Sequence, residues 1–267
     1  MKKRDVVLTT EAHRPAFNDF ADAMRAAESN EGWRSSEVLR HFLEAAFYSI
    51  RGRLLLGDAW RANEAEYMRI VESCRKPNET MGALALMLAA TTRALLTEPV
   101  DFIGPVFSEL SADSGMGQFF TPHHLSYSMA KMIVGDPRAM LGEKGYLTLM
   151  EPACGVGGMI LTANVVLREA GLDVAREAHW TAVDVDQRAV FACYLQLALT
   201  DASADVYRGN SLAPASTWTG TRTPAALFYP KRDPAPELVV EPPAENPVEP
   251  PLVAGPNPEP PVQLTLL

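Results

Sequence analysis

The chain has 267 residues, 47% of them hydrophobic, so it is long enough to bury a sizeable core in one or two domains. Its formal net charge of -9 argues against a protein that only coats nucleic acid, because such proteins are usually basic. Any contact with DNA therefore needs a local patch or a partner chain. The three cysteines lie far apart without a CxxC pair, which predicts neither a disulfide framework nor a zinc site and fits a reducing, cytoplasmic setting.

We expect neither a signal peptide nor a membrane-spanning segment. The charged residues at the start are not followed by an apolar stretch. The longest apolar candidate, residues 81–90, is shorter than the roughly 20 residues that cross a bilayer as a helix.

The first part of the chain is predicted to form a helical domain. Residues 1–15 have the character of a flexible arm, and between 16 and 111 the apolar residues recur at helical spacing. Ser35 or Ser36 suits an N-cap. A later helix at 81–96 is apolar on most faces, which predicts that it is buried. No pattern here indicates chemistry, so we expect a helical bundle that packs on the next domain.

A short motif follows this domain. Residues 117–122 read Gly-Gln-Phe-Phe-Thr-Pro, and Thr121 and Pro122 suit the N-cap and first position of a helix. The motif has two explanations. It is a helix start alone, or it borders a ligand, because Phe120 and the phenylalanine before it would form a wall beside that ligand. The two histidines that follow have no carboxylate or cysteine at ligand spacing nearby, which disfavours a metal site.

A glycine-rich turn is the most informative stretch. Residues 147–158 read Leu-Thr-Leu-Met-Glu-Pro-Ala-Cys-Gly-Val-Gly-Gly. The apolar run 147–151, which ends in an acid, predicts a strand, and an apolar helix is predicted from 159 to 170. Gly155, Gly157 and Gly158 permit backbone conformations closed to larger residues and let a ligand approach the main chain. The N-terminal N–H groups of the helix would point at that ligand. The alternative is a tight strand-to-helix turn without a ligand.

Acidic and amide residues close the next two predicted strands. Asp184 ends a strand at 179–184, which is the position of the acid that binds ribose hydroxyls in nucleotide-binding sheets. Asp186 lies where an N-cap belongs, and we favour that role for it. After a strand at 204–208, Asn210 either hydrogen-bonds a base edge or holds the turn.

The last part of the chain changes in composition. Residues 224–230 are short, apolar and strand-like. Residues 231–262 are acidic and proline-rich, which predicts an extended, disordered linker. The final residues, 263–267, are apolar again, and a short apolar peptide on a polar tether is a common way to present a docking motif.

Three of these stretches together resemble adenine-specific (N6) DNA methyltransferases, above all the modification subunit of type I restriction-modification systems. They are residues 101–122, which contain Gly-Gln-Phe-Phe-Thr-Pro, the glycine turn at 151–158, and Asp184 with Val185. The resemblance implies an α/β fold: a partial Rossmann-like S-adenosylmethionine-dependent methyltransferase sheet, placed at 112–230, behind an α-helical N-terminal domain.

The resemblance also implies a role for individual residues toward S-adenosylmethionine as cofactor. Phe120, Thr121 and Pro122 would border its methionine moiety, and Glu151, Ala153, Gly155 and Gly157 would line it beneath the first strand. Asp184 would accept hydrogen bonds from the ribose hydroxyls, Val185 would lie against the adenine ring, and Asn210 would reach that adenine.

The chain departs from this family at the catalytic loop. The family carries Asn/Asp-Pro-Pro-Tyr/Phe after its fourth strand, where a flipped adenine stacks on the ring and its N6 amino group donates to the Asn or Asp side chain. Here that place holds Tyr229 and Pro230 without the Asn-Pro-Pro unit, so the target pocket would use Tyr229 or a loop that a partner supplies. The family's sheet has more strands, so the fourth strand would be an exposed edge unless a partner or an oligomer covers it.

The C-terminal pentapeptide resembles a second, shorter pattern. Gln263, Leu264, Leu266 and Leu267 are spaced as in the peptide by which bacterial replication proteins dock on the sliding clamp. Two hypotheses follow. The first is N6-adenine methylation of DNA, with Tyr229 or a partner-supplied loop in the target pocket. The second is a catalytically inactive methyltransferase fold that serves as a binding or regulatory module, docked to the clamp through its tail.

Overall fold

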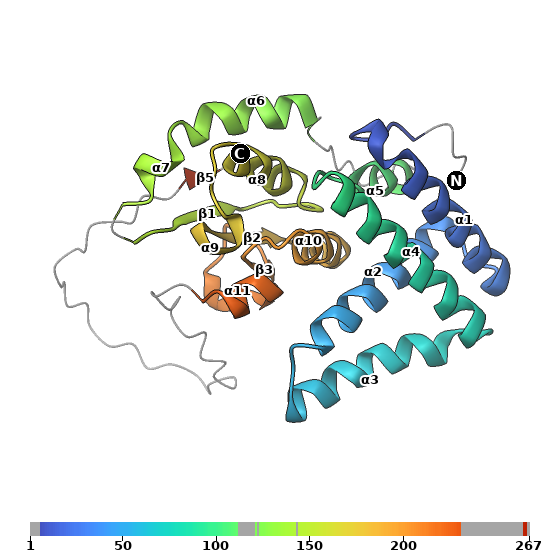
Figure 1. The fold of residues 1–267 in the computed structure, drawn as a ribbon. Coiled ribbons are helices and arrows are strands. Elements are labelled where there is room, and N and C mark those ends of the chain that lie inside the picture. Colours follow the sequence, from blue (N-terminus) through green and yellow to red (C-terminus); the bar gives the residue numbers. More distant parts are fainter. Residues whose placement is uncertain (1–5, 112–120, 122, 143, 231–263, 266–267) are drawn as a thin grey trace.

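A helical unit packs beside an α/β unit in the computed structural model, which describes residues 6–111, 121, 123–142, 144–230 and 264–265 (Figure 1). The helices α1 to α4 form the first unit, and a mixed β-sheet with its crossover helices forms the second. The predicted α/β fold class, with a helical domain ahead of the sheet, is confirmed.

The helical unit contains α1 (Arg14–Glu31), α2 (Ser35–Gly52), α3 (Gly57–Ser73) and α4 (Pro77–Thr97). Gly32 ends α1 in the left-handed conformation at φ 76°, and Pro77 starts α4 at a position that needs no N–H donor. Edge-to-face contacts of Phe20 with Phe42 and with Phe102, at centroid distances of 5.4 and 5.6 Å, join α1 to α2 and to the segment before α5 (Ile103–Ser111).

Part of the predicted N-terminal arm is packed, so that prediction is wrong for the residues that the structure describes. Val6 and Leu8 are buried, and a 3₁₀ turn, η1 (Glu11–His13), leads directly into α1. The Nε2 atom of His13 lies 2.9 Å from the carbonyl oxygen of Glu98, the residue that follows α4 in the chain. Apolar side chains at these positions bury against the helical core, which holds the chain in place.

Helix α4 is longer and less buried than predicted. Leu86 and Leu96 on it are 63% and 75% exposed, so the expected burial on most faces is wrong. Among the described residues, α4 alone is long and apolar enough, by length and composition, to cross a membrane. Ala83, Met87 and Ala94 are nevertheless buried against its neighbours, with α1 the main one, as in the core helix of a domain.

The sheet has the strand order β4-β3-β2-β1-β5. Its strands are β1 (Leu147–Glu151), β2 (Ala178–Asp184), β3 (Ala204–Arg208), β4 (Thr219–Arg222) and β5 (Leu264–Thr265). β5, β1, β2 and β3 are parallel, and β4 is antiparallel to β3. The strands predicted at 147–151, 179–184 and 204–208 are confirmed, and their carboxyl ends meet at one edge because Glu151 pairs with Ala182 and Asp184 with Arg208.

Crossover helices connect the parallel strands. α8 (Gly158–Glu169) and the short α9 (Val174–Glu177) lead from β1 to β2, and α10 (Gln187–Leu199) leads from β2 to β3. α6 (His123–Val134), which α7 (Pro137–Met140) follows, packs on α8, and α10 contacts the helical unit through α2 and α4 (Figure 1). Phe47 of α2 lies 4.5 Å from Phe191 and 4.9 Å from Tyr194, measured between ring centroids, so aromatic packing joins the two units.

The strand predicted at 224–230 is wrong. Those residues form α11 (Pro224–Phe228), and the fourth strand lies just before it, after a 3₁₀ turn, η3 (Ala215–Thr217). Pro224 suits the first helical position, and Thr223 is anchored to the sheet, since its N–H group donates to the carbonyl of Ala204 in β3 at 2.9 Å and its Oγ1 donates to the carbonyl of Ala202 at 2.7 Å. β4, which was not predicted from the sequence, is an edge strand next to β3.

One buried amide connects the two units. The Oε1 atom of Gln196 accepts hydrogen bonds from the backbone N–H groups of Phe102 and Ile103, at 2.8 and 3.1 Å. Its Nε2 atom donates to Oδ1 of Asp101 and to the carbonyl of Val156, each at 2.9 Å. All four hydrogen-bonding capacities of the amide are therefore used, and they join α10 to the start of α5 and to the glycine turn.

Replacing Gln196 with leucine is expected to lower the free energy of unfolding by about 2–4 kcal/mol, because it leaves buried backbone donors and an acceptor without partners. Denaturant titration measures this loss. Gln187→Leu, on the partly exposed first turn of the same helix, is the control, with an expected change within about 0.5 kcal/mol. Equal effects of the two substitutions would contradict the proposed connection.

Candidate functional site

The candidate site lies at the carboxyl edge of the sheet. Glu151 ends β1, Asp184 ends β2, and the glycine turn at 152–157 leads from Glu151 into α8. The turn is tied to the neighbouring strand, because the N–H group of Cys154 donates to the carbonyl of Val183 at 2.9 Å. In open α/β sheets, ligands bind outside the carboxyl ends of the strands, and Glu151, the glycine turn and Asp184 meet at that edge.

Packing accounts for two of the three glycines. Gly157 has φ 95°, and a Cβ there would lie 3.1 Å from Sγ of Cys193 on α10. A Cβ on Gly158 would lie 3.0 Å from Oδ2 of Asp101. Packing against Cys193 and Asp101 therefore explains these two glycines, whereas Gly155, at φ 51°, directs its N–H group toward Asp184.

Asp184 holds the turn from the neighbouring strand. Its Oδ2 accepts a hydrogen bond from the N–H group of Gly155 at 2.8 Å, and its Oδ1 accepts one from the N–H group of Asp186 at 2.9 Å. Each carboxylate oxygen can accept a second hydrogen bond, and the side chain is partly exposed, so a ligand hydroxyl can still reach it. Val185 beside it is 66% exposed, which offers an apolar surface at the same edge.

Glu151 is the most deeply buried acid of the site, with 4% of its surface exposed. Its Oε1 accepts from the N–H group of Ala153 at 3.3 Å, whereas its buried Oε2 has no hydrogen-bond partner among the described residues. Burial, and to a smaller extent the charge of Asp184, raises the pKa of Glu151 to about 7. A buried oxygen without a donor at this edge is a position that a ligand N–H or O–H group would satisfy.

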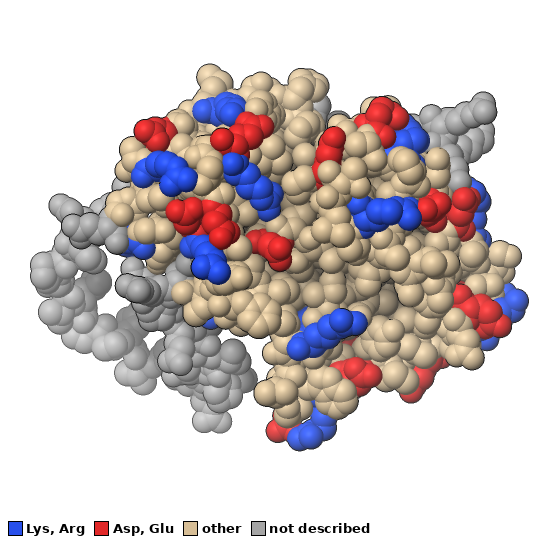
Figure 2. Space-filling view, viewed as in Figure 1, with Lys and Arg blue, Asp and Glu red and all other residues tan. Residues whose placement is uncertain are grey.

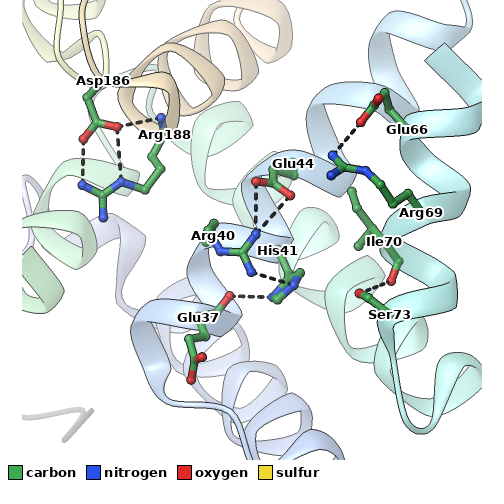
Figure 3. Close-up of polar contacts among 10 residues, drawn as sticks. All are labelled: Glu37, Arg40, His41, Glu44, Glu66, Arg69, Ile70, Ser73, Asp186 and Arg188. Atoms are coloured by element: carbon green, nitrogen blue, oxygen red, sulfur yellow. Dashed lines mark hydrogen bonds and ion pairs between the residues drawn. The ribbon is translucent and has the colours of Figure 1, made fainter. Parts of the chain in front are cut away.

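Local structure explains the polar residues that follow β2 and β3. Asp186 is the N-cap of α10, as favoured from the sequence: it accepts from the N–H group of Arg188 at 2.9 Å and pairs with its guanidinium at 2.8 Å (Figure 3). Oδ1 of Asn210 accepts from the N–H group of Leu212 at 3.0 Å, which forms a turn. The role of Asn210 toward an adenine stays a prediction.

The first turn of α6 lies beside the first turns of α8. Nδ1 of His123 is 3.1 Å from Oγ1 of Thr162, which itself donates to the carbonyl of Gly158. Thr121 is exposed just before α6. Phe120 and Pro122 lie outside the described residues. The polar contacts of His123 place the start of α6, and with it Thr121, near the glycine turn.

Tyr229 lies at the opposite edge of the sheet. β4 runs back along β3, so that Arg222 pairs with Asp205, and α11 begins at the amino ends of the strands. The ring of Tyr229 lies 4.6 Å from the guanidinium of Arg176 and lines a hollow of about 530 Å³ with Arg168. The structure therefore does not bring Tyr229 together with Glu151 and Asp184.

The predicted docking peptide is described in part. Leu264 and Thr265 form β5, in register with Leu149 and Met150 of β1. Gln263, Leu266 and Leu267 lie outside the described residues. Sequence reasoning also missed Asp101 and Gln196. Asp101 carries a signal, since its Oδ1 caps the N–H group of Gly104 three residues later, but nothing in the sequence pairs Gln196 with residues about ninety positions away.

The pKa of Glu151 predicts a pH-dependent stability. The folded protein holds this proton more tightly than the unfolded chain, whose carboxyl group titrates near 4.5, so stability decreases as the pH rises from about 4.5 to 7 and levels off above. Glu151→Gln removes the titration. The free energy of unfolding of the unsubstituted protein, relative to that of Glu151→Gln, is expected to fall by on the order of 3 kcal/mol between these limits. Denaturant titrations across this range measure it, and a flat or rising difference would contradict the assignment.

Comparison with solved structures finds distant likenesses. A Listeria monocytogenes protein described as a class I S-adenosylmethionine-dependent methyltransferase is 14% identical, with a TM-score of 0.42, over 76% of this chain and 55% of that chain. A type I restriction-modification system methyltransferase subunit from Streptococcus thermophilus is 11% identical, with a TM-score of 0.32, over 73% of this chain and 56% of that chain. The chain thus spans little more than half the length of either structure.

A search of curated protein sequences gives no match. A family model gives one: residues 105–223, which contain α6, the glycine turn and the first four strands of the sheet, match the model described as N-6 DNA methylase.

Proposed function

We propose that this chain binds S-adenosylmethionine as an N6-adenine DNA methyltransferase-like protein of the type I modification-subunit kind. The observation that carries the proposal is the meeting of Glu151, the glycine turn and Asp184 at one edge of the sheet, inside the segment that matches the N-6 DNA methylase model. The buried Oε2 of Glu151, which has no donor among the described residues, supports a ligand at this place.

Each residue would act on a different part of the cofactor. Asp184 would accept hydrogen bonds from the ribose hydroxyls, and exposed Val185 would cover a face of the adenine, with Asn210 at its edge. Beneath the first strand, the cofactor would be lined by Glu151, Ala153, Gly155 and Gly157. Its methionine moiety would be bordered by Phe120, Thr121 and Pro122. When bound, S-adenosylmethionine supplies an electrophilic methyl group on its sulfonium.

Methyl transfer needs groups that the described part of this chain does not place at the site. In such a transfer, the N6 nitrogen of adenine would attack the methyl carbon as the carbon–sulfur bond breaks to give S-adenosylhomocysteine, and the proton released from N6 would pass to a hydrogen-bond acceptor or to water. Hydrogen-bond acceptors for the N6 amino group favour this attack. Tyr229 lies at the opposite edge of the sheet. We therefore propose that a partner chain supplies the acceptor loop.

The distribution of charged residues also favours a partner chain that makes most of the DNA contacts. On the face that Figure 2 shows, lysine and arginine are interspersed with aspartate and glutamate and do not gather into a basic stripe. DNA binding draws mainly on contacts of basic groups with phosphates. With a formal net charge of -9, the chain would depend on its partner for most of these contacts.

The second candidate is a binding or regulatory module without methyl transfer. The place of Tyr229 at the amino edge of the sheet favours it, because the described residues then bring the cofactor half together without a target pocket. Docking of the C-terminal peptide on a sliding clamp belongs to this candidate, and it would compete with the pairing of Leu264 and Thr265 with β1.

Asp184→Asn is expected to weaken the binding of S-adenosylmethionine roughly 10- to 100-fold, because hydrogen bonds to an ionised carboxylate are worth about 1.5–3 kcal/mol. Isothermal titration calorimetry measures the affinity. Asp201→Asn is the control with unchanged affinity, since Asp201 lies beyond α10 at the amino edge, at φ 52°, a conformation that asparagine adopts readily. If the unsubstituted protein did not bind S-adenosylmethionine, the proposal would be contradicted.

The chain alone is expected to transfer no methyl group to DNA, and a partner that carries an acceptor loop is expected to enable transfer. Incorporation of labelled methyl groups into DNA, with and without candidate partner subunits, measures it. Asp184→Asn should abolish the transfer and Tyr229→Phe should leave it unchanged. Transfer by the isolated chain would place the acceptor groups within it, and no transfer with any partner would favour the binding-module candidate.

A further inference from the structure

The carboxyl group of Asp101 occupies a cradle between two glycines of distant elements. A Cβ on Gly104, in the first turn of α5, would lie 1.9 Å from Oδ2 of Asp101, and a Cβ on Gly158, the first residue of α8, would lie 3.0 Å from the same atom. Any larger residue at Gly104 would collide with this carboxyl group, and one at Gly158 would crowd it. Glycine at these two positions leaves space for a carboxylate. Neither position needs glycine for its backbone conformation, since neither has positive φ.

The two oxygens of this carboxyl group differ in their partners. Oδ1 accepts hydrogen bonds from the N–H group of Gly104 at 2.8 Å and from Nε2 of Gln196 at 2.9 Å. Oδ2 has no hydrogen-bond donor among the described residues, although burial of the group raises the pKa of Asp101. Asp101 as a whole residue is partly exposed. Oδ2 is a carboxylate oxygen in a place where a cation would stabilise it.

The helix ends around Oδ2 favour an anion rather than a cation. The first turn of α8 begins at Gly158, and α6 begins at His123, beside Thr162 of α8. The amino ends of two helices of twelve residues thus lie together, and unpaired N–H groups at such ends attract anions. Burial lowers the pKa of His123, and the charge of Asp101 opposes this effect, so the two groups interact. One acidic oxygen next to two helix amino ends suits a group with both charges.

We infer that Asp101 binds the α-ammonium group of the cofactor's amino-acid end, while the adjacent first turns of α6 and α8 take its carboxylate. This inference rests on the proposed function, and it assigns the amino-acid end to Asp101 as a binding residue separate from Asp184 and Glu151. It also explains why Gln196 fixes Asp101: the amide holds Oδ1, so that Oδ2 lies between the two glycines.

Two ligands separate the amino-acid end from the nucleoside. S-adenosylhomocysteine carries the ammonium and carboxylate groups, and 5′-methylthioadenosine has the same adenosine and sulfur without them. Asp101→Asn keeps the oxygen that caps Gly104 and replaces only the second oxygen by an NH₂ group. Its expected effect is a loss of S-adenosylhomocysteine affinity of roughly tenfold or more, with 5′-methylthioadenosine affinity unchanged within about twofold. Calorimetric titration of both ligands measures this difference.

Gly158→Ala is the second variant. Its backbone is helical and suits alanine, but the added Cβ would crowd Oδ2 of Asp101, so the same selective loss is expected. Asp184→Asn should weaken both ligands, and Asp201→Asn should weaken neither. Melting temperatures of the variants show whether each one is folded, and Gly158→Ala decides the question if Asp101→Asn does not fold.

Each outcome has a separate meaning. Selective loss of S-adenosylhomocysteine in Asp101→Asn or Gly158→Ala supports the assignment of Asp101. Equal loss of both ligands, or no loss of either, overturns that assignment and leaves the proposed cofactor site standing. Failure of the unsubstituted protein to bind either ligand overturns the proposed function itself, and the role of Asp101 with it.

Discussion

The buried amide of Gln196 is the interaction on which the arrangement of this molecule depends. It binds the start of α5, Asp101 and the glycine turn at the same time, with no unused donor or acceptor. A buried amide that lost one of these partners would keep the cost of desolvation without its compensation. The helical unit and the candidate site are therefore held in one geometry, and a change in the packing of α10 against α2 would reach the glycine turn directly.

Three carboxyl groups surround the turn, and they differ because their surroundings differ. Asp184 is partly exposed and accepts two backbone hydrogen bonds. Glu151 is buried, one of its oxygens has no donor in the part of the chain that the structure describes, and burial raises its pKa to about 7. Asp101 lies in a glycine cradle with one oxygen capped. An acidic site of this kind suits a ligand that brings hydroxyl and ammonium donors, because each donor would relieve a repulsion or an unsatisfied oxygen.

The candidate site and Tyr229 lie at opposite edges of the sheet. The carboxyl edge of the sheet is assembled from β1, β2 and α8, yet β4 carries the chain back to the amino edge, where Tyr229 packs on Arg176. A methyltransferase needs both a cofactor and a target pocket on the same edge. Under the proposed function, the described residues therefore place the candidate cofactor site at one edge and Tyr229 at the other.

Local patterns in the sequence were enough to predict the three parallel strands, the helices between them, the glycine turn and the position of Asp184. These features depend on neighbours along the chain: apolar runs, glycines that permit a turn, and an acid at the end of a strand. Asp186 was correctly favoured as an N-cap for the same reason. Residues 224–230 were misread as a strand because a short apolar run fits either state, and Pro224 and the anchor of Thr223 decide for a helix.

Only the tertiary structure decided the rest. The contacts of Gln196 with residues about ninety positions away, the glycine cradle of Asp101 and the exposed side of α4 all depend on which elements pack together. The reversal of the chain at β4, which separates Tyr229 from the carboxyl edge, depends on the antiparallel pairing with β3. Such contacts join residues that are distant in sequence, and no periodicity or turn signal along the chain encodes them.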